Sequence, residues 1–140
     1  MKRLVQILIC FLFFSQHLAA QGERDKIETM RFNFISSKIE LTSNESEKFW
    51  PLYNEYNDKV KAIKKNLRQN YKRKIENLGD KEADELLTLE IQSKQAEADL
   101  FKLYNERFKS IIGSKKLVKL HLAEEAFKRE IINTIKDKND

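Results

Sequence analysis

Residues that interrupt helices are scarce in this sequence. It has three glycines and one proline in 140 residues. No stretch shows the sustained alternation of β-branched and polar residues that indicates a strand. Two of the glycines, Gly79 and Gly113, fall where predicted helices would end. These scarcities argue against a β-rich fold and favour long helices.

Side chains that bind transition metals or attack substrates are equally scarce. Cys10 is the only cysteine, and beyond residue 20 there is one histidine, His121, and one methionine, Met30. Without a further cysteine, the stability of that part of the chain has to come from packing. We find no Ser/His/Asp arrangement and no phosphate-binding loop. We therefore expect no catalytic residue, no cofactor and no metal site, and a protein that is not an enzyme.

The first twenty residues (1–20) have the layout of a secretory signal peptide. Two basic residues precede an apolar run, residues 4–14, and a polar and then small-residue segment ends at Ala20. An uncleaved anchor is the alternative, but a bilayer span needs about 20 apolar residues. The pattern predicts cleavage after Ala20 and export to the periplasm. Residues 21–140 are then a single helical domain with no integral membrane segment.

The charge balance says little in favour of nucleic acid. The formal net charge is +5, and removal of residues 1–20, which hold two basic residues and no acid, leaves +3. A mild excess of this size, on an exported chain, argues against a nucleic-acid partner.

Apolar residues recur at steps of three and four along four segments, which predicts four helices. The first covers residues 24–40, and the second begins after Thr42 and ends near Leu78. The third covers residues 81–112, and the fourth follows a break at Gly113.

Local signals support these boundaries. Leu41, Thr42 and Glu45 form a helix-cap motif, in which the Thr42 hydroxyl and the Glu45 carboxylate each accept from the other residue's amide. Pro51 cannot donate a backbone hydrogen bond, so we expect a kink or a break in the second helix there. Gly79 is predicted to end that helix in a left-handed conformation.

The fold class predicted from these elements is all-α. Helices two and three are each about 50 Å long, and they form a long antiparallel helical hairpin with the two shorter helices packed at its open end. Broad apolar faces need several neighbours. The predicted core aromatic residues are Phe49, Trp50, Tyr53 and Tyr56, with Trp50 buried where the shorter helices meet the hairpin.

The outer part of the hairpin has a narrower apolar seam. The predicted core-facing residues of the third helix are Ala83, Leu87, Ile91, Ala98, Phe101, Tyr104, Phe108 and Ile112. Between residues 60 and 95 this seam is thin and Lys94 interrupts it. We expect a thinly cored two-helix arm that is either mobile or half of a homodimer interface.

Charges are segregated along the arm. Residues 59–74 hold eight basic residues and no acid, and residues 80–99 hold seven acids and two lysines. On one interpretation the two runs pair across the hairpin, with Lys72 and Arg73 opposite Asp84 and Glu85. On the other, the surplus cations attract acidic protein clients or anionic lipid headgroups. The residues predicted to bind a partner are Lys61, Lys64, Lys65 and Arg68.

Three segments resemble a known family: residues 31–35 (Arg-Phe-Asn-Phe-Ile), residues 41–56 with Leu-Thr and Glu-Lys-Phe-Trp-Pro-Leu-Tyr, and residues 115–130. They are similar to small periplasmic proteins described as sensors of ECF-type sigma factors, and to the Spy/CpxP proteins. The LTxxQ motif of the latter opens a long helix in a four-helix, cradle-like dimer. Here Glu45 replaces the glutamine, and residues 112–116 lack a second copy of the motif.

The resemblance implies a function in envelope stress through contact with other proteins. The first hypothesis is a Spy/CpxP-like, ATP-independent periplasmic chaperone that binds protein clients. The alternative is a regulatory sensor subunit. Because an exported chain cannot touch a cytoplasmic sigma factor, that subunit would have to act through a membrane-bound regulatory protein.

Overall fold

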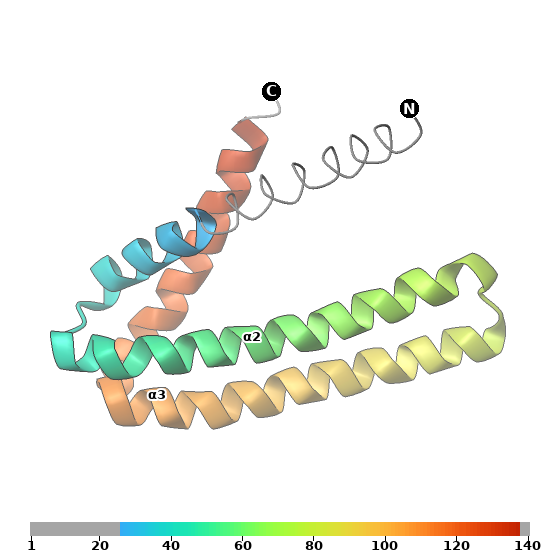
Figure 1. Cartoon of the computed structure of the whole chain (residues 1–140), viewed down its shortest axis with the longest axis horizontal. Helices are drawn as coiled ribbons and strands as arrows, with labels where there is room; N and C mark the ends of the chain where they lie inside the picture. Colours follow the sequence, from blue (N-terminus) through green and yellow to red (C-terminus); the bar gives the residue numbers. More distant parts are fainter. Residues whose placement is uncertain (1–25, 138–140) are drawn as a thin grey trace, which may run out of the picture. The chain divides into compact units, whose positions relative to one another are not determined.

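The computed structural model describes residues 26–137, apart from the side chains of residues 135 and 137. Every regular element in this range is helical, so the prediction of an all-α fold is confirmed. A helix covers residues 26–39, α2 covers Ser43–Lys74, the short 3-10 helix η1 covers Ile75–Asn77, and α3 covers Asp80–Asp137 (Figure 1).

The described residues fall into two compact units. One, the terminal unit, holds residues 26–40 and 119–137, and the other, the central unit, holds residues 41–118. The predicted signal peptide, with its cleavage site after Ala20, lies outside the described residues. A single domain over residues 21–140, with short helices at the open end of a hairpin, stays a prediction.

The predicted count of four helices is wrong for this range, which holds three α-helices and η1. The predicted third and fourth helices are one element, α3, with a kink at Gly113. Gly113 has φ 76° and ψ 163°, a conformation that is open almost only to glycine. Gly113 is the one residue of α3 with non-helical backbone angles, and the helix continues directly after it, so no loop divides α3.

Two other local predictions are also corrected. Of the kink or break expected at Pro51, the break does not occur, since Pro51 lies inside α2, which is continuous over its whole range. Gly79 does not have a positive φ. Its carbonyl instead accepts from the amide of Ala83 at 2.9 Å, which places Gly79 at the start of α3.

The terminal unit buries one face of each of its helical segments. Ile35 and Ile39, four residues apart, are buried, as are Leu120 and Phe127 of α3. The ring of Phe34 lies 5.6 Å from that of Phe127. Burial of residues at this spacing is typical of an amphipathic helix packed along one stripe.

In the central unit, α2 and the first part of α3 run side by side in opposite directions (Figure 1). At one end the ring of Phe49 lies 5.3 Å from that of Phe108. Further along, Lys64 lies 3.3 Å from Glu97, and the Tyr71 hydroxyl lies 3.0 Å from Glu90. These contacts fix the register in which the two helices face each other.

The seam between these helices is thick at one end and thin at the other. The thick end buries Phe49, Tyr53, Tyr104, Phe108 and Ile112. Between residues 57 and 100, by contrast, the buried side chains are only Leu86 and Ser93. The narrow seam expected for the arm is therefore present in the central unit.

Candidate functional site

The helix-cap motif lies at the start of α2. The Thr42 amide donates to Glu45 Oε2 at 2.7 Å, and the Glu45 amide donates to Thr42 Oγ1 at 3.3 Å. Lys116 Nζ, which sequence reasoning missed, donates to the same Glu45 oxygen at 2.5 Å. The hydrogen bond from Lys116, followed by that from the Thr42 amide, lowers the pKa of Glu45 from 4.5 to about 2. The motif, with Leu41 half-buried beside it, thus ties the start of α2 to α3.

The four predicted core aromatics are not equally buried. Phe49 and Tyr53 are buried, whereas Trp50 and Tyr56 are half-buried. Trp50 follows Phe49 by one position, which turns it about 100° away from the seam. Its ring meets those of Phe49 and Tyr53 edge-on at 5.0 and 5.3 Å. The ring of Tyr56 lies 5.2 Å from that of Tyr104, tilted by 41°, and the Tyr104 hydroxyl donates to Glu55 of α2. These residues stabilise the helix pair.

The basic run of α2 is paired only in part. Lys64 contacts Glu97 at 3.3 Å, and Lys74 forms an ion pair with Glu85. The predicted pairing of Lys72 and Arg73 with Asp84 and Glu85 does not occur, because Lys74 is the residue that faces Glu85 and Arg73 donates to Asn70. Pairing across the helices therefore accounts for two cations of the run.

The predicted partner-binding residues divide accordingly. Lys61 lies 3.9 Å from Asp58 on its own helix, and Lys64 is engaged across the seam. Lys65 and Arg68 form no ion pair with any residue in the range 26–137. Lys72 likewise forms no ion pair in this range, although the sequence did not predict it as part of the site.

Four cations of α2 share one stripe. Lys61, Lys65, Arg68 and Lys72 follow one another at steps of four, three and four, which places them on one helix face. All four are exposed. The stripe is about 16 Å long. Lys61 lies three residues before Lys64, and Arg68 lies four residues after it. The stripe therefore runs along α2 directly beside the Lys64–Glu97 contact.

An apolar stripe of α3 flanks the same side. Leu87 lies three residues before Glu90, Ile91 lies four residues after Leu87, and Phe101 lies four residues after Glu97. Their exposed fractions are 57%, 70% and 48%. Sequence reasoning placed these three residues in the core, and the structure corrects that prediction.

The correction has a physical reason. Leu86, Ser93 and Leu100 also recur at helical spacing, one or two positions away from the predicted stripe. The two series differ by a rotation of about 100° per position, and both meet at Tyr104. Periodicity alone does not decide which series faces α2, whereas the contacts of Glu90 and Glu97 do. The cations and the three apolar residues together form what we call the basic–apolar face: Lys61, Lys65, Arg68, Lys72, Leu87, Ile91 and Phe101.

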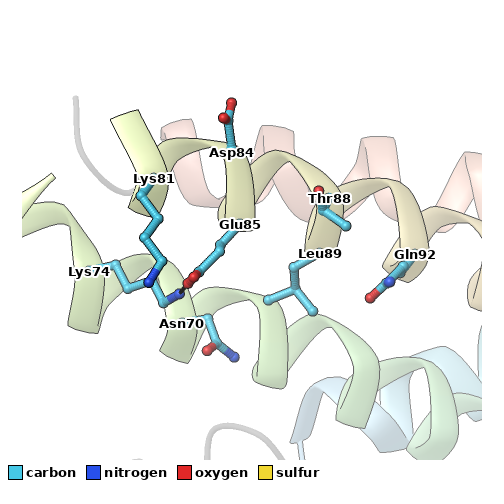
Figure 2. Close-up of a pocket in the computed structure, with 8 residues that line it drawn as sticks. All are labelled: Asn70, Lys74, Lys81, Asp84, Glu85, Thr88, Leu89 and Gln92. Atoms are coloured by element: carbon cyan, nitrogen blue, oxygen red, sulfur yellow. Dashed lines mark hydrogen bonds and ion pairs between the residues drawn. The ribbon is translucent and has the colours of Figure 1, made fainter. Parts of the chain in front are cut away.

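A groove lies on the other side of the helix pair. It has a volume of about 700 Å³, and Figure 2 shows the ion pair of Lys74 and Glu85 within it. Asn70 and Leu89, which line it, each precede a residue of the Tyr71–Glu90 contact by one position, whereas Lys72 and Ile91 each follow one. One position turns a side chain by about 100°, so the two pairs point to opposite sides of the contact. Lys74, with a smaller effect of Lys81, lowers the pKa of Glu85. The paired charges leave the groove without a strong preference for an ion.

Metal binding, titration of a histidine and membrane insertion are the other features of the described residues that bear on function. Among residues 26–137, no group of three or more His, Cys, Asp or Glu side chains could hold a metal ion. His121 is half-buried, and burial lowers its pKa. In the same range, no helix is both long enough and apolar enough to cross a membrane.

Comparison of the chain with protein-family models, curated proteins and solved structures gives no match. The resemblance to sigma-factor sensors and Spy/CpxP proteins therefore stays a prediction carried by the residues named for it.

Proposed function

We propose that this chain is an exported, ATP-independent chaperone of the cell envelope that binds unfolded proteins on the basic–apolar face. The observation that carries the proposal is the presence of large exposed apolar side chains beside cations that have no acid to neutralise them. Leu87 and Ile91 are more than half exposed, and Lys65, Arg68 and Lys72 have no ion pair within residues 26–137.

Each stripe has a separate physical effect on a client. The cations raise the association rate with acidic chains, because like charges arranged on one face steer an oppositely charged partner. The apolar side chains then remove client apolar surface from water, at about 25 cal/mol per Å². Because each apolar contact is small and open to solvent, the complex is weak and exchanges without ATP.

The thin seam supports the same proposal. Local stability follows buried apolar contact, and only Leu86 and Ser93 are buried in the outer part of the helix pair. The helices there adjust at low cost, which suits a surface that binds many different sequences.

The experiment is suppression of aggregation of reduced α-lactalbumin by the protein purified from the envelope of expressing cells. Light scattering is recorded for the wild type, a stripe variant and a charge-matched control. The stripe variant carries Lys65→Gln, Arg68→Gln and Lys72→Gln. The control carries Lys109→Gln, Lys115→Gln and Lys128→Gln, three exposed lysines outside the face.

The wild type and the control should suppress scattering, and the stripe variant should lose most of the effect. The difference should shrink at high salt, because screening acts beyond about 8 Å at 0.15 M. Equal suppression by all three proteins would show that the face is not the client site. Absence of suppression by the wild type, with one membrane protein captured in a 1:1 ratio from envelope extract, would instead support the regulatory-subunit alternative.

A further inference from the structure

The basic–apolar face carries charge of one sign. Two acids beside it are engaged within the helix pair: Glu97 with Lys64, and Glu90 with the Tyr71 hydroxyl and with Lys94 at 3.7 Å. Asp58 lies 3.9 Å from Lys61, and the exposed Asp84, three residues before Leu87, lines the groove on the other side of the pair. The cations Lys65, Arg68 and Lys72 have no such partner within residues 26–137. What covers this face must therefore bring negative charge.

A second copy of the chain does not meet this requirement. A twofold axis that stacks the face on its own copy sets either α2 on α2 or α2 on α3. The first arrangement places four cations against four cations. The second places the cations against Leu87 and Ile91, where they would lose hydration without gaining an acid.

The middle of the face offers no apolar recess. The space between the two stripes holds the Lys64–Glu97 and Tyr71–Glu90 contacts, which are polar, and the groove of Figure 2 lies on the other side. A third helix packed between α2 and α3 would meet these polar groups and not an apolar seam. The two stripes point outward over the same length of the pair, an arrangement that suits a broad and deformable partner.

We propose that the basic–apolar face docks on the surface of an anionic phospholipid bilayer. The lysine and arginine side chains reach lipid phosphates through their long aliphatic stems. Leu87, Ile91 and Phe101 enter the boundary between headgroups and acyl chains, as the apolar side of an interfacial helix does. The inference goes beyond the proposed chaperone function, and lipid and client would compete for the same side chains.

The expected strength follows from the number of cations. One cation near an anionic surface contributes about fivefold in the partition coefficient. Loss of the three unpaired cations should therefore weaken binding on the order of 100-fold. Leu87→Ser with Ile91→Ser should weaken it at least about tenfold, because the exposed parts of the two side chains, 57% and 70%, would no longer be removed from water.

The test is co-sedimentation of protein, purified from the envelope of expressing cells, with two kinds of vesicles. One kind contains equal amounts of phosphatidylglycerol and phosphatidylcholine, and the other contains phosphatidylcholine alone. The variant Lys65→Gln/Arg68→Gln/Lys72→Gln, the double serine variant and the charge-matched control Lys109→Gln/Lys115→Gln/Lys128→Gln are measured beside the wild type. Circular dichroism checks that each variant keeps its helix content.

We expect the wild type and the control to bind the anionic vesicles, to release them in about 0.5 M salt, and to ignore phosphatidylcholine. Both face variants should bind more weakly. Equal binding by the stripe variant and the control would overturn the inference, because net charge alone would then explain it. So would failure of the wild type to bind anionic vesicles, and if aggregation is still suppressed in that case, the face serves proteins and the chaperone proposal stands.

Discussion

A difference in cooperativity between the two ends of the central unit follows from how its apolar side chains are distributed. Phe108 is 3% exposed and lies within 6.3 Å of the rings of Phe49, Tyr53, Tyr56 and Tyr104. Phe108→Ala leaves a cavity in the thick end of the seam and should cost about 3–5 kcal/mol. Against a global stability of about 5–15 kcal/mol, this is a large share.

Leu86 is equally buried, but it lies in the thin end of the seam. Leu86→Ala cannot lower the global free energy of unfolding by more than the free energy with which the outer part of the helix pair, residues 60–95, is itself folded. Because Leu86 and Ser93 are the buried residues there, that free energy is small. We expect a global loss of about 1–2 kcal/mol, below the usual 2–5 kcal/mol for a buried leucine.

Urea unfolding followed by far-UV circular dichroism gives the global loss, and amide exchange read by mass spectrometry gives the local one. Phe108→Ala should speed exchange along both helices, whereas Leu86→Ala should speed it chiefly within residues 60–95. Leu103→Ala, at a site 48% exposed, is the control and should change little. Equal global losses from the first two variants, with slow exchange along the whole pair, would refute the account in which residues 60–95 unfold separately.

Three further outcomes test the ends of the helices. Thr42→Ala should cost about 0.5–2 kcal/mol, seen as a lower melting temperature, because it removes the cap of α2. The Glu45 pKa of about 2 lies below its unfolded value, so the stability that ionised Glu45 contributes is present above about pH 4.5 and is lost as the pH falls toward 2. The difference in stability between the wild type and Glu45→Gln should therefore vanish in acid. A difference that stays constant with pH would contradict the low pKa of Glu45. Glu40 has φ 53°, and Glu40→Gly should stabilise the fold by about 0.5–1 kcal/mol by relieving left-handed strain. Glu40→Ala, which loses the exposed pair with Lys119 and keeps a side chain at this φ, should not.

Local structure could be predicted from the sequence where the signal is local. Thr42 and Glu45 are three residues apart, and their capping geometry needs nothing from the rest of the chain. The sequence predicts the position of the turn near Gly79, but not the conformation of Gly79. The sequence predicts a break at Gly113. Whether a glycine ends a helix or kinks it depends on whether the residues after it continue as a helix, which a single sequence does not show.

The candidate site could be predicted only in part, because it depends on contacts distant in sequence. The basic run was evident, but its division into paired and unpaired cations rests on Lys64 meeting Glu97 and Lys74 meeting Glu85. The apolar stripe was assigned to the wrong side, because Leu86 and Leu87 belong to two series that helical periodicity treats alike. Lys116 was missed as a partner of Glu45 for the same reason, since 71 residues separate them.

The placement of leucines in α3 separates stability from binding. A chain under selection for stability alone would put large apolar side chains in the seam, yet Ser93 is buried there while Ile91 is 70% exposed. If the exposed stripe serves binding, then Leu87→Gln with Ile91→Gln should leave the free energy of unfolding within about 0.5 kcal/mol, because both sites are exposed and glutamine is a good helix former. The same variant should lose client or vesicle binding. Leu86→Gln is the matched control, since it buries an amide in the seam and should lower stability. A fall in stability from the double variant comparable to that of Leu86→Gln would mean that the stripe is part of the core, and full retention of binding would mean that it has no part in the function.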